Sequence, residues 1–244
     1  MRRPKIGIPL TLDERGRWRE GRAYHYIDRS YADAIDSAGA VALQLPIQAD
    51  PAALIDSLDG LLIPGGDDFP TEGAVQGGLR DEIVLDLVSP VQLAFDEALF
   101  EAASERGIPI LGICYGMQLM ARMRSGVLDT HLPSQRRGVD CHTLPPEARH
   151  PIRIEPDSRL ACILGSETCE VNSLHQQAVH RVGSMHRTVA TSSDGVIEAI
   201  ERSGASAGPW EIGVQWHPEK MAEESSQRLF RAFVHACRKS DDEL

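Results

Sequence analysis

Short apolar runs recur along the first half of the chain, and longer stretches with apolar residues three or four positions apart lie between them. The short runs are typical of buried strands, and the longer stretches are typical of helices with one apolar face. The predicted strands are Lys5–Leu10, Val41–Leu45, Leu61–Ile63 and Ile108–Ile113. The predicted helices are Tyr24–Ala38, Pro51–Leu58, Pro90–Arg106 and Tyr115–Arg124. This alternation predicts a parallel sheet with right-handed crossovers.

Capping residues support these boundaries. Asp50 precedes Pro51, and Ser89 precedes Pro90, as expected for N-caps followed by proline at the first helical position. Ser89 and Gln92 have the spacing of a capping box. The face of this helix that is expected to point inward consists of Val91, Phe95, Ala98, Leu99 and Ala102.

The pattern changes after Gly126 to short strands joined by turns, followed by a closing helix at Glu223–Arg238. The predicted strands are Ile152–Ile154, Glu170–Asn172, Thr188–Thr191, Val196–Ile200 and Ile212–Trp216. We therefore expect an α/β fold with a doubly wound, mostly parallel sheet flanked by helices and extended by antiparallel strands. Because no Pro/Gly/Ser-rich linker divides the chain, residues 1–244 are expected to form a single domain.

Charge and composition narrow the range of partners. The formal net charge of the 244 residues is −11, without a Lys/Arg-rich run, which argues against nucleic acid or an anionic membrane as a partner. The five cysteines have no regular spacing, which is typical of a reduced, cytoplasmic protein. No Cys/His cluster has metal-ligand spacing, so we expect no metal and no cofactor, and the pair Cys141-His142 is interpreted as incidental.

The stretch Gly107–Met120 contains the strongest candidate for chemistry. Cys114 lies where a predicted strand meets a predicted helix, between Gly112 and Gly116, and small neighbours leave room for so tight a turn. This is the spacing of a nucleophile elbow, with sulfur in place of the serine oxygen. The following helix N-terminus favours the thiolate. The alternative is a buried structural cysteine.

A cysteine nucleophile needs a base and a group that orients the base. His217 follows the predicted strand Ile212–Trp216, and Pro218 is expected to hold the next residues extended, so that Glu219 can turn back onto the imidazole. The alternative is a surface histidine with a solvated glutamate. Should His217 not be the base, His175 is the next candidate. The histidines without a comparable context are interpreted as structural: His25, His131, His142, His150, His180, His186 and His235.

Backbone N–H groups are expected to stabilise the oxyanion that develops in such a reaction. Gly65-Gly66 follows a predicted strand and exposes its amides, and the N–H of Tyr115 is the second donor expected from an elbow. An ordinary tight turn at Gly65-Gly66 is the alternative. Asp67 and Asp68 are interpreted as loop acids.

Four motifs, PGGDD, GICYGMQ, VNSLHQQAV and GVQWHPE, occur in the order and spacing of class I glutamine amidotransferase-like proteins. The segments YADAIDSAGAVALQLP, DGLLIPGG and DGVIEAIE resemble the γ-glutamyl-γ-aminobutyrate hydrolase branch of that family. The resemblance extends over nearly the whole chain. Four motifs in order are far more specific than any one of them.

The resemblance implies roles for individual residues. It implies a catalytic triad of Cys114, His217 and Glu219, and an oxyanion hole formed by Gly66 and Tyr115. Gln118 matches a side chain that contacts the γ-glutamyl group. The loop that matches the binding site for the amino and carboxylate ends of the substrate consists of Asn172, Ser173, Leu174 and His175. From the residues alone, this loop is interpreted as a strand-ending turn.

The chain also departs from the hydrolase branch. The branch commonly has arginine directly after the nucleophile, where this chain has Tyr115, and an Arg-Asp pair where this chain has Gln92-Leu93. Both departures concern the pocket for the leaving amine. Tyr115 would suit an apolar or aromatic amine; the alternative is that its ring packs in the core and contributes only its backbone N–H. If the amine carries a carboxylate, Arg22 is the candidate for a cation that pairs with it.

Three functions remain open at this point. The first is a hydrolase that cleaves γ-glutamyl amides through a cysteine thioester and acts alone on a small molecule. The second is a glutaminase subunit that supplies ammonia to a separate synthetase, since no synthetase domain follows Leu244. The third is a catalytically silent regulatory domain, which the intact set of Cys114, His217 and Glu219 argues against. A homodimer is compatible with each of them.

Overall fold

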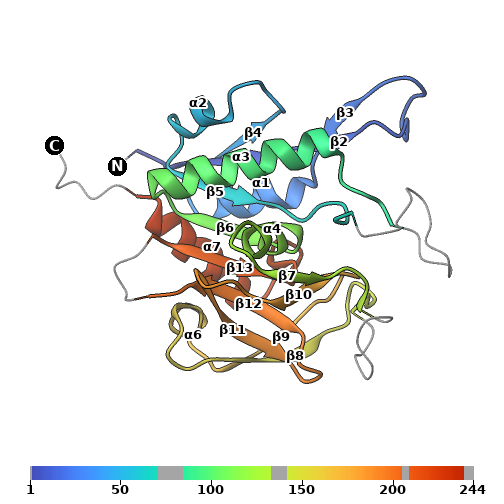
Figure 1. Cartoon of the computed structure of the whole chain (residues 1–244). Helices are drawn as coiled ribbons and strands as arrows, with labels where there is room; N and C mark the ends of the chain where they lie inside the picture. Colours follow the sequence, from blue (N-terminus) through green and yellow to red (C-terminus); the bar gives the residue numbers. More distant parts are fainter. Residues whose placement is uncertain (1, 71–84, 133–141, 205–208, 239–244) are drawn as a thin grey trace.

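The computed structural model describes residues 2–70, 85–132, 142–204 and 209–238. Its centre is a nine-stranded sheet with the strand order β4-β1-β5-β6-β13-β12-β11-β8-β9. Figure 1 shows helices on both faces of this sheet. Among the described residues, no helix has both the length and the apolar composition that crossing a membrane requires.

The half of the sheet that contains the early part of the chain is parallel. Its strands are β4 (Val41–Leu45), β1 (Lys5–Pro9), β5 (Gly60–Ile63), β6 (Ile110–Ile113) and β13 (Glu211–Val214). Each neighbouring pair in this series is parallel. The predicted α/β fold with a parallel sheet is therefore confirmed in this half.

The other half is antiparallel. It consists of β12 (Ile197–Arg202), β11 (His186–Ser192), β8 (His150–Ile154) and β9 (Thr168–Val171), and β12 joins it to the parallel half by pairing with β13. The expected antiparallel extension is present, and its strands agree with the predicted ones to within a few residues. The sheet as a whole is mixed.

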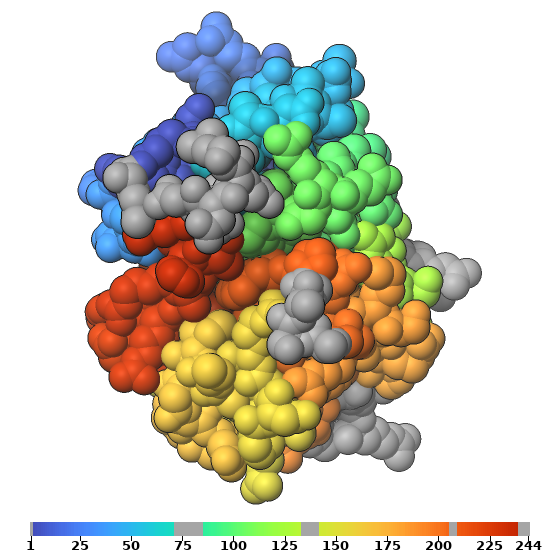
Figure 2. Space-filling view, turned by 90° about the vertical axis from the view of Figure 1, so that its left-hand side faces the viewer, coloured from blue at the N-terminus to red at the C-terminus, as the bar shows by residue number. Residues whose placement is uncertain are grey.

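Two helical layers cover the sheet because its strands are apolar on both faces. On one face, α1 (Arg29–Ser37), α6 (Arg159–Leu164) and α7 (Glu224–Ala236) contribute to one core cluster. Figure 2 shows α7 in red between the blue N-terminal segments and the yellow region of α6, in agreement with its contacts to α1 and α6. On the other face, α3 (Pro90–Arg106) and α4 (Tyr115–Met123) contribute to a second cluster.

Two predictions near the N-terminus are wrong. The helix expected from Tyr24 begins at Arg29, where the Asp28 side chain caps the backbone N–H of Ser30. Before it, β3 (Tyr24–Tyr26) pairs with β2 (Thr11–Asp13), inside the stretch expected to be a loop. Aromatic residues at Tyr24 and Tyr26 favour a strand, and the Asp28 cap stops the helix from extending backward.

The prediction for α3 is right in its boundaries and partly right in its inward face, where Phe95 and Leu99 are buried. Ser89 is the N-cap but makes no side-chain capping hydrogen bond, and Val91 is 56% exposed. Gln92 and Asp96 are buried instead, and Gln92 accepts a hydrogen bond from the N–H of Leu12 at 2.8 Å. Tertiary partners for these polar groups therefore override the apolar pattern.

The remaining elements lie around the sheet. The short helix α2 (Pro51–Ile55) begins at the predicted Asp50 cap, whose side chain accepts from the N–H of Ala53 at 3.1 Å. A separate pair of strands, β7 (Val127–Asp129) and β10 (Ala178–Arg181), was not predicted. The turn η1 (Pro218–Lys220) follows β13.

Candidate active site

Cys114 lies on the strained turn that the sequence predicts between β6 and α4. Its backbone has φ 51° and ψ −105°, a conformation that a residue with a side chain rarely adopts. A Cβ atom on Gly116 would lie 2.2 Å from the carbonyl oxygen of Ile63. Glycine is therefore required where the elbow helix passes β5, and this close approach fixes the position of Cys114.

His217 and Glu219 meet as predicted, although by a different backbone path. Glu219 Oε1 lies 2.7 Å from His217 Nδ1, and the carboxylate is fully buried. Residues Pro218–Lys220 form a 3-10 turn and not the extended segment that was expected. The turn brings Glu219 back onto the ring, which orients the other imidazole nitrogen, Nε2, for chemistry.

Asn172 holds the backbone of the histidine in place. Its Oδ1 accepts from the N–H of His217 at 2.8 Å, and its Nδ2 donates to the carbonyl oxygen of His217 at 2.9 Å. The sequence predicts Asn172 as a substrate-binding residue. In the structure its side-chain amide is used by His217, so a contribution to substrate binding would have to come from its backbone.

The charges of the cysteine and glutamate control the protonation of His217. Burial by itself would lower the pKa of this histidine, but the interaction with Cys114 and the hydrogen bond that His217 donates to Glu219 outweigh burial and raise the pKa to about 10. The favoured state of His217 near neutral pH is therefore an imidazolium.

Two residues near the triad were not singled out from the sequence. Gln215 Nε2 lies 3.5 Å from Cys114 Sγ, and the Tyr31 hydroxyl accepts from the N–H of Gly65 at 2.9 Å. A Cβ atom on Gly65 would lie 2.6 Å from His217 Cε1, so glycine there makes room for the imidazole. Gln215 belongs to the GVQWHPE motif, and this motif could have indicated it. For Tyr31 the sequence gives no indication beyond its place on the apolar face of a predicted helix.

A pocket of about 240 Å³ opens beside Cys114. Gly66 and Tyr115, the predicted oxyanion donors, both line it. Because the N–H of Gly65 is bound to Tyr31, Gly66 is the member of the glycine pair that remains suited to this role. The other lining residues are Asp67, Asp68, Asp86, Gln118, Thr143, Leu174, His175, Gln176 and Gln177.

The predicted substrate-binding residues divide into two groups. Gln118, Leu174 and His175 line the pocket, and Gln118 Nε2 donates to the carbonyl oxygen of Gln177 at 2.9 Å and to Gln215 Oε1 at 3.2 Å. The Ser173 side chain turns away from the pocket, and its hydroxyl donates to the carbonyl oxygen of His142 at 2.9 Å.

The Tyr115 side chain is part of the core. Its ring stacks on Phe69 with centroids 4.8 Å apart, and its hydroxyl donates to Asp96 Oδ2 at 3.0 Å. Burial raises the pKa of Asp96 to about 7. Tyr115 is only 2% exposed, which favours packing of its ring over contact with an aromatic amine.

The mouth of the pocket is acidic. Arg15 pairs with Asp67 at 2.8 Å and with Asp86 at 3.0 Å, and burial raises the pKa of Asp68 to about 6. Among the described lining residues there is no arginine or lysine. Arg22, the predicted cation for a carboxylate on the amine, is exposed and is not part of this lining.

A second group of chemically capable side chains lies behind the Asn172–His175 loop. His142, His150 and Glu198 each place a ligand-type atom within 4.8 Å of the others. The sequence interpretation treats both histidines as structural and does not consider Glu198. These residues come from separate segments, so no spacing in the sequence could have indicated them.

Comparisons with known proteins extend over nearly the whole chain. The Peptidase C26 family model matches residues 4–219. A γ-glutamyl-γ-aminobutyrate hydrolase of Escherichia coli K12 is 32% identical, over 97% of this chain and 94% of its own. A provisionally named glutamine amidotransferase of Mycobacterium tuberculosis is 35% identical, over 96% of this chain and 75% of its own.

A solved structure agrees with the fold. A protein of Thermoplasma acidophilum that is provisionally named as part of a GMP synthase superposes with a TM-score of 0.64 at 17% identity, over 97% of this chain and 95% of its own. At this identity the likeness concerns the fold alone. Together with the family match, it confirms the predicted class I glutamine amidotransferase-like architecture.

Proposed function

The chain belongs to the Peptidase C26 family, and from this premise we propose that it hydrolyses the γ-glutamyl amide bond of γ-glutamyl amines, releasing glutamate and an amine. Similarity to the hydrolase of Escherichia coli supports an amide hydrolase. The observation that carries the proposal is the pairing of His217 with Glu219 at 2.7 Å, next to a strained Cys114 that lines a pocket.

The proposed reaction begins with attack of the Cys114 thiolate on the amide carbonyl carbon. The carbonyl oxygen becomes an oxyanion that accepts hydrogen bonds from the N–H groups of Gly66 and Tyr115. His217 then gives its Nε2 proton to the amine nitrogen, the C–N bond breaks, and the amine leaves. A γ-glutamyl thioester remains on the sulfur.

Water completes the cycle. Neutral His217 takes a proton from the water, whose oxygen attacks the thioester carbonyl carbon, and the C–S bond breaks to release glutamate and the thiolate. The proton on His217 restores the starting imidazolium. Glu219 keeps the imidazole oriented through both halves and stabilises its charged form.

The γ-glutamyl half of the substrate is proposed to be recognised more strictly than the amine half. Gln118, Leu174 and His175 line the pocket beside the nucleophile. A substrate that lacks the charged amino acid end would leave buried polar groups of the pocket unpaired, which costs about 1–3 kcal/mol for each group. The acidic mouth favours leaving groups that carry a positive charge.

The test is glutamate release by the purified chain, without any second protein. We expect release from γ-glutamyl-γ-aminobutyrate, γ-glutamyl-anilide and γ-glutamyl-1,4-diaminobutane, with slower release from glutamine, and none from the Cys114→Ala variant. Activity on glutamine alone that appears only with an added synthetase would instead identify a glutaminase subunit. No activity on any of these amides would favour the silent regulatory domain.

The proposal also includes the setting of the reaction. We infer one domain over residues 1–244, a cytoplasmic enzyme that needs no cofactor for catalysis, and a small-molecule substrate without a nucleic acid or membrane partner. The net charge of −11 supports the last point. A homodimer remains compatible with this setting, and sedimentation of the purified chain measures it.

A further inference from the structure

Glu198 on β12 is a buried carboxylate that no proton donor satisfies. Its side chain is fully buried, and neither carboxylate oxygen has a hydrogen-bond partner among the described residues. A buried charge without a partner is strongly unfavourable, so a group of this kind requires a cation beside it.

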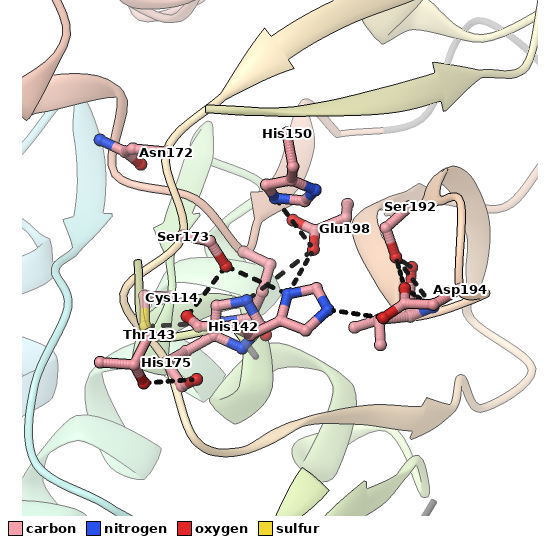
Figure 3. Close-up of polar contacts among 12 residues, drawn as sticks. Cys114, His142, Thr143, His150, Asn172, Ser173, His175, Ser192, Asp194 and Glu198 are labelled. Carbon is pink, nitrogen blue, oxygen red and sulfur yellow. Dashed lines mark hydrogen bonds and ion pairs between the residues drawn. The ribbon is translucent and has the colours of Figure 1, made fainter. Parts of the chain in front are cut away.

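Three imidazole nitrogens surround this carboxylate. His142 Nδ1 lies 3.5 Å from Glu198 Oε1, and the Nε2 atoms of His150 and His175 each lie 3.8 Å from the same oxygen. Figure 3 shows the three rings turned toward Glu198. These separations are too long for hydrogen bonds, whose usual range is about 2.7–3.2 Å.

Outer partners orient two of these rings. His175 Nδ1 lies 3.0 Å from the carbonyl oxygen of Gln177, which can only accept, so Nδ1 donates and Nε2 of the neutral ring is a lone pair. His142 Nε2 lies 3.0 Å from Asp194 Oδ2, and this contact orients the ring so that Nδ1 faces Glu198.

Ser173 contacts both the backbone and the ring of His142. Its hydroxyl donates to the backbone carbonyl oxygen of His142 at 2.9 Å, and the hydroxyl oxygen lies 3.0 Å from His142 Nδ1. His142 Nδ1 therefore faces both this oxygen and the Glu198 carboxylate.

A metal ion would satisfy His142, His150 and Glu198 at once, because one ligand-type atom from each lies within 4.8 Å of the others. Zinc binds imidazole nitrogen and carboxylate oxygen at about 2.0–2.2 Å in a tetrahedron, which places two of its ligand atoms roughly 3.3 Å apart. The separations of 3.5 and 3.8 Å in the cluster are close to that value. Histidine ligands whose other nitrogen donates to a carboxylate or a carbonyl are also characteristic of metal sites.

We propose that His142, His150 and Glu198 form a binding site for a zinc-type divalent ion, with His175 beside it. Imidazole nitrogen and carboxylate oxygen match the ligand preference of zinc among the ions available to proteins. This proposal opposes the expectation of no metal from the sequence, and it does not depend on the hydrolase activity.

The location gives the ion a role. His175 lines the pocket beside Cys114, and Ser173 of the same loop bonds to His142. An ion held by His142, His150 on β8 and Glu198 on β12 would connect this loop, through Ser173, to the antiparallel half of the sheet. The ion would thus order the loop that lines the pocket without touching the reacting atoms.

The first experiment measures metal content. The purified Cys114→Ala chain, which removes the catalytic thiol as a competing ligand, is stripped with a chelator, dialysed against zinc and analysed by mass spectrometry of the metal. We expect about one zinc per chain and a melting temperature roughly 5–10 °C higher at free zinc about 100 times Kd. No bound zinc and no change in melting temperature would overturn the proposal.

Variants locate the ion. Glu198→Gln and His150→Gln in the same background should lose most of the bound zinc, whereas His235→Gln, at an exposed position on α7, should retain it. If the first two variants do not fold, X-ray absorption of the zinc-loaded parent distinguishes the outcomes, because imidazole and carboxylate ligands give only nitrogen and oxygen neighbours. Sulfur neighbours, or equal zinc in Glu198→Gln, would contradict the site.

Discussion

Two buried groups of histidine and glutamate lie on opposite sides of the Asn172–His175 loop, and they differ in how the carboxylate is satisfied. Glu219 forms a 2.7 Å contact with His217, whereas Glu198 lies 3.5–3.8 Å from three imidazole nitrogens without a hydrogen bond. In the first group, a single proton between the imidazole and the carboxylate satisfies both side chains. The second has the spacing of ligands around a larger cation.

The loop itself shows this division residue by residue. Asn172 turns to the catalytic side and holds the backbone of His217, while its neighbour Ser173 turns to the other side and bonds to His142. Alternate residues of an extended segment point in opposite directions, so one short loop can support two sites. The same residue types can therefore serve proton transfer or metal binding, depending on the distance between the imidazole nitrogen and the carboxylate oxygen.

The largest effect is expected from removing the catalytic side chains. We expect Cys114→Ala and His217→Ala each to lower kcat by about 10⁴–10⁶-fold, and the double variant to lose little more than either alone, because the two act as one unit. Steady-state glutamate release measures this. Near-normal turnover in His217→Ala at saturating substrate would make His175 the next candidate for the base.

Glu219→Gln should have a smaller effect than loss of the nucleophile. The glutamate only orients and stabilises the imidazolium, so we expect a loss of kcat roughly 100-fold smaller than that of Cys114→Ala. Glu198→Gln is the matched control on the other side of the loop. If the two glutamine variants changed kcat equally, the distinction between the two carboxylates would not hold.

Replacing Asn172 separates positioning from substrate binding. Asn172→Ala removes both hydrogen bonds to the backbone of His217, and we expect kcat to fall about 10–100-fold with KM changed less than about threefold. The neighbouring variant Ser173→Ala should show a smaller fall in kcat. A large rise in KM with unchanged kcat in Asn172→Ala would show that the side chain binds substrate instead.

The pH dependence of alkylation tests the charge state of the catalytic pair. Because the pKa of His217 is raised to about 10, its imidazolium persists beside Cys114 between pH 7 and 9, and the iodoacetamide rate at Cys114 should change by less than about threefold. The rate at exposed Cys162 should instead rise with pH over the same range.

Peptide mapping measures the alkylation of each cysteine in one sample. Cys114 should be the thiol that reacts first at pH 7, and Cys237, whose pKa is raised by burial, should react last. Cys141 lies outside the described residues and serves as a further comparison. Faster reaction of Cys141 or Cys237 than of Cys114 would contradict the assignment of the nucleophile.

The smallest expected effect concerns Tyr115. Tyr115→Phe keeps the stacking on Phe69 and the backbone N–H, but it removes the hydroxyl donor to buried Asp96. We expect kcat/KM for γ-glutamyl-anilide to change by less than about threefold, while stability falls by about 1–3 kcal/mol in denaturant unfolding. A loss of activity only with substrates that carry aromatic amines would show instead that the Tyr115 ring lines the pocket for the amine.

The sequence by itself determined the parallel half of the fold and the catalytic candidates. Strands such as Val41–Leu45 and the elbow at Cys114 depend on local patterns, namely continuous apolar runs and glycines at a turn. His217 and Glu219 are two positions apart, so their meeting also follows from local geometry. A family motif added Gln118 and the Asn172–His175 loop, which the residues alone would not have singled out.

Only the tertiary structure decided how the buried polar groups are used. The partners of Tyr115, Gln92 and Asp96, and the direction in which Ser173 points, depend on segments far apart in the chain. His142, His150, His175 and Glu198 come together because β8, β12 and two loops meet, although the first and last of these residues are 56 positions apart in the sequence. Periodicity reports only a residue's neighbours along the chain, whereas such a cluster depends on contacts that form when distant strands pair.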